Sequence, residues 1–304
     1  MTGSRGFVGP WLLKHLQEQG DETVELPEET DVTDFSGLDA AVREARPDAI
    51  YHLAAQANVA SSWEDPAGTF AVNAAGTLNL CTSASALVPL PRVLLVSSAE
   101  VYGRVDLQRM PVREDEPFAP ATPYAASKAA AEMVGLQAWL GRGLPLVRAR
   151  AFNHTGPGQG PGFVVPDLAA QVARAARGEL DKITTGNLAV SRDIIDVRDV
   201  VRAYRLLLLG GVAGEAYNVC RGEAVAISDL LGRLMRAAGV DVPVREDPSR
   251  FRPADVPVHV GDPGRLWALT GWQPQVPLDQ TLADVLSSLF NAAAKTLAEP
   301  EAGP

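Results

Sequence analysis

The amino-acid sequence predicts an α/β fold in which a doubly wound parallel sheet is followed by a smaller C-terminal lobe. Short, continuously apolar runs alternate with stretches of helical spacing through the first half of the chain. Such runs are typical of strands that helices cover on both faces. After residue 160 the pattern changes, because Pro, Gly and Arg become frequent between helical stretches. This change predicts the second lobe.

The individual elements follow from two kinds of spacing. Phe7, Val8, Trp11, Leu12 and Leu16 recur along one helix face and predict the first helix. The run Val-Leu-Leu-Val at 93–96 is apolar at every position and predicts a strand buried on both faces. In chain order, the expected strands are 23–26, 49–53, 92–97 and 144–151, and the expected helices are 7–16, 35–46, 69–87, 127–140, 165–177 and 227–239.

Composition excludes several classes of function. The formal net charge of −10 repels phosphate backbones, so we expect no nucleic-acid partner. No apolar run approaches the 18 or so residues that span a bilayer, and no secretory signal opens the chain, so we expect a cytoplasmic protein without a membrane partner. Cys81 and Cys220 are too few for a disulfide framework, and the four histidines are scattered. We therefore expect no metal site.

A glycine-rich turn at the start of the chain indicates a dinucleotide site and a Rossmann-like sheet. Gly3, Gly6 and Gly9 have the spacing G-x-x-G-x-x-G and open the helix that contains Phe7 and Val8. Glycine lets the backbone turn tightly and approach a pyrophosphate, whose charge the helix N-terminus stabilises. A strand normally precedes such a turn, yet only two residues do so here. We therefore expect a truncated first strand and a native chain that begins upstream of Met1.

The choice between NAD and NADP depends on the residues after the expected strand at 23–26. Glu28 and Glu29 occupy the place of an acidic ribose ligand, and no arginine is close to them in the sequence. A carboxylate there repels the 2′-phosphate of NADP, so the pattern favours NAD over NADP. A solvated turn explains the two glutamates equally well, and both cofactors stay open.

Ser98, Tyr124 and Lys128 form the most specific catalytic pattern in the sequence. Tyr124 and Lys128 are four residues apart and share one face of a helix. A free tyrosine has a pKa of about 10, and a nearby ammonium lowers that pKa by favouring the phenolate. Ser98 follows a buried strand, where it can hydrogen-bond a reacting oxygen. The three residues predict acid–base chemistry on a carbonyl or alcohol.

With these motifs the chain resembles the extended short-chain dehydrogenases/reductases over essentially its whole length. Further matching segments are Asp31-Val-Thr-Asp34, Tyr51-His-Leu-Ala-Ala55 and Asn73-Ala-Ala-Gly-Thr77. The resemblance implies that Asp31 and Val32 bind the adenine end of the cofactor. It also implies that Leu53, Ala54 and Ala55 bind the middle of the cofactor, that Asn73 lies beneath the active site, and that the protein forms a homodimer. By position we expect a dinucleotide-binding domain over 1–160, to which parts of 184–220 return, and a nucleotide-sugar lobe over 161–304.

The second half of the chain resembles, more narrowly, the GDP-6-deoxy-4-keto-D-mannose reductases. The matching segments include Arg148-Ala-Arg-Ala-Phe-Asn-His-Thr-Gly156, then 192–199, 252–255 and 271–278. The resemblance implies hydride transfer from NAD(P)H to the C4 ketone of GDP-4-keto-6-deoxy-D-mannose, giving GDP-D-rhamnose. Asn153, Arg192, Arg252 and Asp255 are the expected ligands of the nucleotide sugar, since an arginine can present two donors to a diphosphate.

Glu100 keeps a second enzyme class open. The GDP-mannose 4,6-dehydratases resemble the same stretch and use a glutamate at the matching place to remove the C5 proton, which makes Glu100 a further candidate for catalysis and substrate contact. Position 99 is alanine, which disfavours the dTDP-glucose 4,6-dehydratases. A UDP-sugar 4-epimerase is a third alternative. A dinucleotide sensor or an inactive truncated form is the non-enzymatic one.

Overall fold

The computed structural model describes residues 1–251 and 256–298. Its main sheet is parallel and has the strand order β1-β2-β3-β7. Neighbouring strands are aligned residue by residue, with Ile50 opposite Val93 and Leu94 opposite Val147. The four strands are β1 (Ala49–His52), β2 (Arg92–Ser98), β3 (Leu146–Ala151) and β7 (Ala216–Val219).

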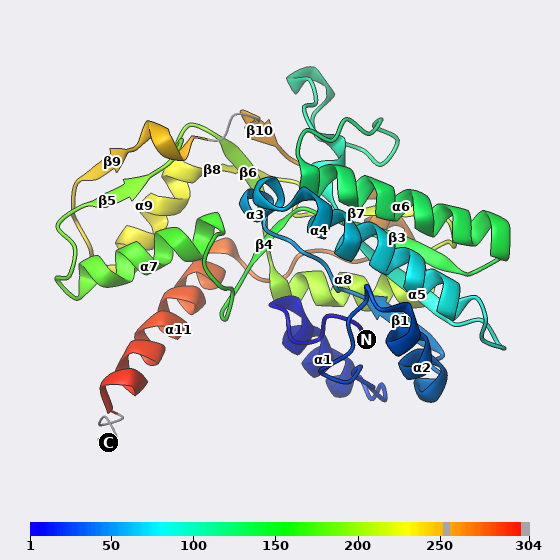
Figure 1. The fold of residues 1–304 in the computed structure, drawn as a ribbon. Coiled ribbons are helices and arrows are strands. Elements are labelled where there is room, and N and C mark those ends of the chain that lie inside the picture. Colours follow the sequence, from blue (N-terminus) through cyan, green and yellow to red (C-terminus); the bar gives the residue numbers. More distant parts are fainter. Residues whose placement is uncertain (252–255, 299–304) are drawn as a thin grey trace.

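Helices cover both faces of this sheet, as the doubly wound fold requires (Figure 1). Helices α5 and α6 pack on one face, while α8 packs on the other beside α1. Strand β7 and helix α8 come from the second half of the sequence, so this half returns to the first sheet. The helices of this part are α1 (Val8–Glu18), α2 (Phe35–Ala45), α3 (Val59–Glu64), α4 (Pro66–Phe70), α5 (Gly76–Ala84), α6 (Pro123–Arg142) and α8 (Val197–Gly210), with a π-helical turn at Ala71–Ala75 and 3-10 turns at Ala99–Tyr102 and Leu107–Arg109.

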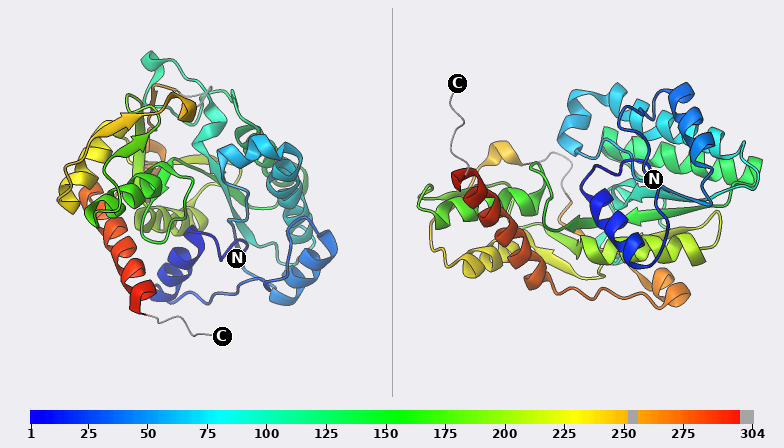
Figure 2. Two further views of the ribbon diagram at one scale, coloured as in Figure 1. Left: turned by 60° about the vertical axis from the view of Figure 1, so that its left-hand side comes forward. Right: turned by 90° about the horizontal axis from the view of Figure 1, so that it is seen from below.

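Most of the remaining elements lie to one side of the main sheet, but α10 packs against α8 and β7 (Figures 1 and 2). Helices α7, α9 and α11 enclose a core of their own with the strands β5 and β6. Strand β6 pairs with β4 and β10 in parallel and with β8 in antiparallel orientation, and β5 pairs with β9. The bounds are β4 (Asn153–Thr155), α7 (Val164–Ala176), β5 (Ile183–Thr185), β6 (Ser191–Asp196), β8 (Ala224–Ala226), α9 (Ile227–Ala238), β9 (Val244–Glu246), β10 (Val258–His259), α10 (Gly264–Thr270) and α11 (Leu278–Ala298), with a 3-10 turn at Pro248–Arg250.

Helix α6 shows why the local sequence folds as it does. Thr122 precedes the helix in extended conformation, and its hydroxyl accepts a hydrogen bond from the backbone N–H of Ala125 at 3.1 Å. Pro123 stands at the first helical position, where no amide hydrogen is needed. Gly143 ends the helix at φ +71°, a left-handed conformation that favours glycine. These end signals fix the register of the helix that carries Tyr124 and Lys128.

The truncated N-terminal strand and the strand expected at 23–26 do not form regular strands in the structure. Thr2 makes one parallel bridge to His52, and the backbone of Met1 exchanges hydrogen bonds with Val24 and Leu26. Met1 and Thr2 therefore lie where the first strand of the sheet belongs. The prediction of a strand at 23–26 was wrong, because a ladder partner of only two residues cannot sustain regular pairing there. In the described part of the chain, no helix is both long and apolar enough to cross a bilayer.

Candidate active site

The carboxyl ends of the parallel strands bring the predicted residues to one edge of the sheet. His52, at the end of β1, is opposite Leu95, and Ser98, at the end of β2, is opposite Ala151 of β3. The segments that follow these strands therefore leave the sheet side by side. In parallel α/β sheets, ligands bind at this edge, where the strand order reverses.

The glycine turn at the start of the chain is tightly packed at two of its three glycines. Gly3 has φ +68°, and a Cβ there would lie 2.6 Å from the backbone nitrogen of Ala54. A Cβ on Gly9 would lie 1.9 Å from the backbone oxygen of Ser4. A Cβ on Gly6 would come no closer than 3.4 Å to any protein atom. Internal packing therefore explains Gly3 and Gly9 but not Gly6, whose open side is free for a ligand.

A pocket of about 380 Å³ opens beside this turn. Predicted cofactor residues that line it are Gly3, Gly6, Asp31, Val32 and Ala54. No side chain caps the N-terminus of α1, where helical amides lack internal partners. An open glycine, uncapped amides and an acidic residue fit the adenosine and pyrophosphate parts of a nicotinamide dinucleotide.

An arginine lies near Glu28 and Glu29 in the structure, although none is close to them in the sequence. Arg5 lines the same pocket as Glu28 and Glu29, and its guanidinium is 3.6 Å from the Glu28 carboxylate. The sequence separates these residues by more than twenty positions, so only the fold brings them together. A candidate phosphate ligand is thus present, but it is already paired with a carboxylate.

Asn73, which the resemblance puts beneath the active site, connects the turn after β1 to helix α6. Its side-chain oxygen accepts a hydrogen bond from the Gln56 backbone N–H at 2.8 Å, and its amide donates to Ser127 of α6 at 2.8 Å. Asn73 thereby ties the turn after β1, which contains Leu53 and Ala55, to the helix of Tyr124. It does not line the pocket beside the glycine turn.

Ser98 and Tyr124 meet at the end of β2. The Ser98 hydroxyl hydrogen-bonds the Tyr124 phenol, and it also accepts from the backbone N–H of Glu100 at 3.2 Å. Burial raises the pKa of Tyr124 to about 12; the Ser98 hydrogen bond opposes this rise and the charge of Glu100 adds to it. The phenol therefore carries its proton at neutral pH.

Lys128 does not lower the pKa of Tyr124 in this structure, contrary to our expectation. Its ammonium donates a hydrogen bond of 2.6 Å to the backbone oxygen of Val96 on β2. Burial lowers the pKa of Lys128 to about 8, while the negative charge of Glu132 opposes this change. The physical reason for the difference is that the ammonium is directed at the strand rather than at the phenol.

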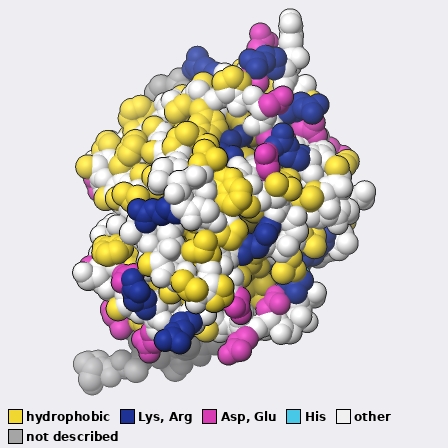
Figure 3. Space-filling model, turned by 90° about the vertical axis from the view of Figure 1, so that its right-hand side faces the viewer, with side chains coloured by type: hydrophobic (Ala, Val, Ile, Leu, Met, Phe, Trp, Pro, Cys, Tyr) yellow, Lys and Arg dark blue, Asp and Glu magenta, His cyan; other side chains and the backbone are white. Residues whose placement is uncertain are grey.

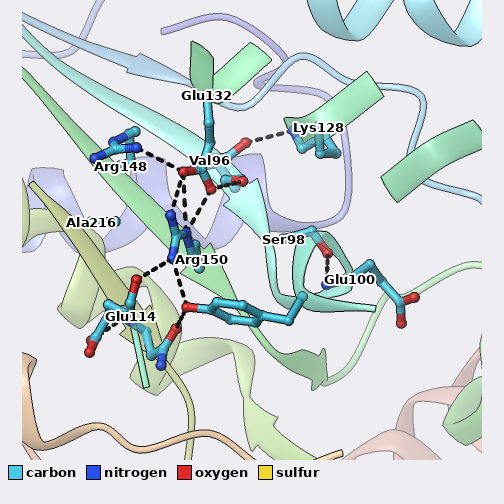
Figure 4. A network of polar contacts seen from close by, with 12 residues as sticks. Val96, Ser98, Glu100, Glu114, Lys128, Glu132, Arg148, Arg150 and Ala216 are labelled. Carbon is cyan, nitrogen blue, oxygen red and sulfur yellow. Dashed lines mark hydrogen bonds and ion pairs between the residues drawn. The ribbon is translucent and has the colours of Figure 1, made fainter. Parts of the chain in front are cut away.

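The predicted substrate ligands are only partly brought together. Glu100 stands on the 3-10 turn directly after Ser98, and its carboxylate points away from the buried polar network (Figure 4). Asn153 begins β4, which pairs with β6. Arg192 of β6 donates to the backbone oxygens of Ser191 and Val256. Arg252 and Asp255 lie outside the described residues.

Sequence reasoning missed a buried ionic network next to the predicted site (Figure 4). Glu132 of α6 is fully buried and pairs with Arg148 and Arg150 of β3. Arg150 also donates to the hydroxyl of Tyr102 at 2.9 Å. A glutamate within an alanine-rich helix, four residues after Lys128, is the signal that could have revealed this network. Across 1–251 and 256–298, no group of three His, Cys, Asp or Glu residues is placed to hold a metal ion.

Comparisons with known proteins agree with this geometry. The family model described as GDP-mannose 4,6 dehydratase matches residues 27–285. The chain is 38% identical over 290 residues to "GDP-6-deoxy-D-mannose reductase" of Pseudomonas aeruginosa, a match that covers 94% of this chain and 95% of the relative. Two solved structures are also similar. "RMD from Pseudomonas aeruginosa complexed with NADPH" has a TM-score of 0.88 at 37% identity and covers 95% of this chain and 97% of its own. The "UDP-glucose 4-epimerase complex with NAD" of Thermus thermophilus has a TM-score of 0.84 at 30% identity and covers 96% of this chain and 98% of its own.

These matches extend over nearly the whole chain, and the fold they share is the Rossmann-like sheet described above. The family uses a nicotinamide dinucleotide, in agreement with the glycine turn and its pocket. The chain belongs to the GDP-mannose 4,6-dehydratase family of the extended short-chain dehydrogenases/reductases.

Proposed function

We propose that the protein reduces the C4 ketone of GDP-4-keto-6-deoxy-D-mannose with NADH or NADPH, giving GDP-D-rhamnose. The observation that carries the proposal is the hydrogen bond between Ser98 and the Tyr124 phenol, which sets a proton donor at the carboxyl edge of β2. Reduction of a ketone needs a proton donor beside the oxygen, whereas oxidation of an alcohol needs a base. The relative from Pseudomonas aeruginosa that is 38% identical carries the name of such a reductase.

Each residue of the proposed site has a defined task. The cofactor supplies hydride when bound. Ser98 orients the ketone oxygen, and Tyr124 delivers the proton to it. Lys128, as an ammonium, binds the ribose next to the nicotinamide. Asn153, Arg192, Arg252 and Asp255 bind the nucleotide sugar.

The cofactor is held by the glycine turn and the pocket beside it. Gly3, Gly6 and Gly9, with Phe7 and Val8 at the start of α1, surround the pyrophosphate. The other predicted contacts extend from the adenine to the nicotinamide, in the order Asp31, Val32, Leu53, Ala54, Ala55 and Asn73. Within this scheme NADH is favoured, because Glu28 both repels a 2′-phosphate and occupies Arg5.

The proposed division of labour follows the two parts of the fold. Residues 1–160, with parts of 184–220, bind the dinucleotide, and residues 161–304 mainly bind the GDP-sugar. Both ligands are highly charged and do not cross a bilayer unaided, so we expect the enzyme to work in the cytoplasm, where they are made.

We also infer a homodimer, formed through α5 and α6. Helix α5 contains no charged residue, and the only charged residues of α6 are Lys128, Glu132 and Arg142, of which the first two are buried. Leu78 of α5 and Met133 of α6 are exposed. Figure 3 shows hydrophobic side chains gathered over much of this side of the molecule. Isologous pairing of the two helices with those of a second copy would cover this surface.

The decisive experiment is incubation with GDP-4-keto-6-deoxy-D-mannose and either NADH or NADPH, with the product identified by NMR. We expect oxidation of the cofactor together with formation of GDP-D-rhamnose. A product with the other configuration at C4, or no turnover with either cofactor, would refute the assignment.

A second candidate is the GDP-mannose 4,6-dehydratase reaction. It is favoured by Glu100, whose carboxylate lies outside the buried network and whose charge reaches Tyr124. In this role Glu100 would remove the C5 proton of an oxidised intermediate. Incubation with GDP-mannose and an oxidised cofactor distinguishes the two enzymes, because only the dehydratase forms the 4-keto-6-deoxy sugar.

A further inference from the structure

Strand β2 and helix α6 are joined at three consecutive strand residues. Three residues of α6 that are spaced four apart each make one polar contact with a different one of these strand residues. Lys128 donates to the Val96 backbone oxygen at 2.6 Å, and Ser97 donates to a Glu132 carboxylate oxygen at 2.6 Å. The three pairs are Val96 with Lys128, Ser97 with Glu132, and Ser98 with Tyr124. Two of the three helix residues belong to the proposed active site, but Glu132 does not.

The Glu132 carboxylate is fixed from the next strand. Arg150 contacts both of its oxygens, with its Nε 2.9 Å from one and its Nη2 2.9 Å from the other. Arg148 donates to the second oxygen at 3.1 Å. Arg150 lies directly opposite Ser97 in the β2–β3 ladder. A fully buried carboxylate with this many donors has one orientation available to it.

We propose that Glu132 is a positioning residue, which fixes α6 to the end of β2 and stabilises the ammonium form of Lys128. This inference rests on the proposed reductase function, in which Lys128 acts as a cation that binds the ribose of the cofactor. Glu132 does not reach the edge of the sheet where substrate would bind, because it lies two helical turns from Tyr124. It acts on the reaction only through Lys128 and Ser97.

The charges around Lys128 support this role. Burial lowers the pKa of Lys128 to about 8, and Glu132 is the group whose charge opposes this change. From β1, His52 faces the same region, and burial lowers its pKa to about 3, so it is neutral. From β3, Arg148 and Arg150 face Glu132 and carry positive charge. The remaining neighbours are Tyr124, Tyr102 from the 3-10 turn after β2, and Glu100, whose charge acts on Tyr124.

The sign of the effect on catalysis follows from these charges. Reduction needs the ammonium form of Lys128, so the rate falls as pH rises through the Lys128 pKa. If the negative charge of Glu132 is removed, the ammonium is less stable and the pKa of Lys128 falls. The alkaline limb of the kcat profile then moves to lower pH.

The primary test is Glu132→Gln, which keeps the shape of the side chain and removes its charge. The sequence contains four lysines, so the Lys128 amine can be followed by NMR of lysine labelled with ¹⁵N at Nζ. We expect the Lys128 pKa to fall by about one pH unit, and the alkaline limb of kcat to fall with it, at little-changed KM. An unchanged Lys128 pKa in the variant would overturn the electrostatic part of the proposal.

The NMR titration separates this proposal from the proposed function, because it needs no substrate. If the wild-type protein reduces no GDP-sugar, the function fails while the Lys128 titration still decides the role of Glu132. Glu132→Gln leaves two buried guanidinium groups without a counter-charge and could prevent folding. The double variant Glu132→Gln with Arg148→Met removes one positive charge as well, which acts on the Lys128 pKa in the opposite direction, so this pKa should still fall but by less than in the single variant.

Ser97→Ala tests the positioning part separately, because it removes only the contact between Glu132 and β2. We expect kcat to fall about 3- to 10-fold at unchanged KM and unchanged Lys128 pKa. Wild-type kcat in this variant would overturn the positioning role. The matched control is Asp199→Asn on α8, a buried carboxylate that pairs with Arg202. Asp199→Asn should lower Tm about as much as Glu132→Gln does, but it should leave the Lys128 pKa unchanged.

Discussion

At the scale of the residue, Tyr124 is suited to donate a proton at the start of the proposed reduction. Burial and the nearby Glu100 charge both favour the neutral phenol, and only the Ser98 hydrogen bond favours the phenolate. A neutral phenol can donate a proton to a ketone oxygen at once. The same phenol would first have to lose its proton before it could act as the base when an oxidised cofactor takes hydride from an alcohol, which is the opening step of a dehydratase.

Tyr124→Phe should therefore lower kcat for ketone reduction by about 100- to 10,000-fold. KM for the GDP-sugar should change little, because the ring remains and only the hydroxyl is lost. The measurement is steady-state oxidation of NADH or NADPH. Tyr217→Phe on β7 is the matched control, since it also removes a buried hydroxyl, one that accepts from Val212, and it should keep nearly full kcat. Equal turnover by both variants would contradict the role of Tyr124.

At the same scale, we expect Arg5 and Glu28 to set the choice of cofactor. The two side chains are exposed and 3.6 Å apart, so the ion pair itself adds little stability. Its effect is on selectivity, because it neutralises the cation that a 2′-phosphate would need. We expect the wild-type protein to have a higher kcat/KM with NADH than with NADPH.

Glu28→Gln should shift this preference toward NADPH by about 10-fold or more, because it removes a repulsive charge and releases Arg5. The ratio of the two kcat/KM values measures the effect. Glu44→Gln on α2 is the control, since it removes a charge outside the pocket and should leave the ratio unchanged. An unchanged ratio in Glu28→Gln would show that Glu28 does not discriminate between the cofactors.

At the scale of the element, we expect two glycines of the N-terminal turn to have different roles: Gly9 in packing and Gly6 in ligand binding. Gly9→Ala places a Cβ 1.9 Å from a backbone oxygen, so the backbone must move, and we expect a loss of about 1–3 kcal/mol in the free energy of unfolding. Gly6→Ala meets no protein atom within 3.4 Å and should leave Tm nearly unchanged. Calorimetry measures both variants.

Cofactor affinity should show the complementary result. The Cβ of Gly6→Ala would project where we place the pyrophosphate, so Kd for NADH should rise about 10-fold or more in a protein of normal stability. Gly210→Ala at the end of α8 has open space around it and serves as the control for both measurements. Normal NADH binding by Gly6→Ala would move the cofactor away from this turn.

The elements also show how far the sequence alone can predict this protein. Helix α6 was predicted at 127–140 and found at Pro123–Arg142, and strand β2 was also predicted, because helical spacing and continuous apolar runs are local properties of the sequence. The strand at 23–26 was predicted wrongly because strand formation depends on a partner, and the partner is distant in sequence. The pairing of Arg5 with Glu28 and of Glu132 with two arginines was missed for the same reason. The sequence shows the types of these residues, but the packing of distant segments determines which of them become neighbours.

At the scale of the whole molecule, buried histidine couples folding to pH. His52 connects Thr2, at 2.8 Å from its Nδ1, with Thr77 of α5, at 3.1 Å from its Nε2. Burial lowers its pKa to about 3, against about 6.5 in an unfolded chain. Between these values the unfolded state binds more protons, so the free energy of unfolding decreases as pH falls through this window.

We expect His52 to account for roughly 2 kcal/mol of lost stability between pH 6.5 and 5. His52→Asn should be less stable than the wild type at pH 7, because contacts to Thr2 and Thr77 weaken. Its stability should nevertheless depend less on pH over the same window. Urea unfolding at several pH values measures both effects. His15→Gln on α1, which alters a partly exposed histidine, is the control; an equal pH slope in wild type and His52→Asn would contradict the role of His52.

The outer surface of α5 and α6 extends the argument to the assembly. In an isologous dimer each substitution occurs twice and faces its own copy or a near neighbour, so a single charge on this surface acts against association. Met133→Glu would bury two carboxylates without partners at the helix–helix contact. We therefore expect the wild-type protein to sediment as a dimer and Met133→Glu to sediment as a folded monomer.

Leu209→Glu on α8, an exposed leucine on the opposite face of the sheet, is the control and should remain dimeric. Because α6 carries Tyr124 and Lys128 on its buried face, loss of the partner should also lower kcat. A wild-type protein that sediments as a monomer at all concentrations would show that this surface has another use.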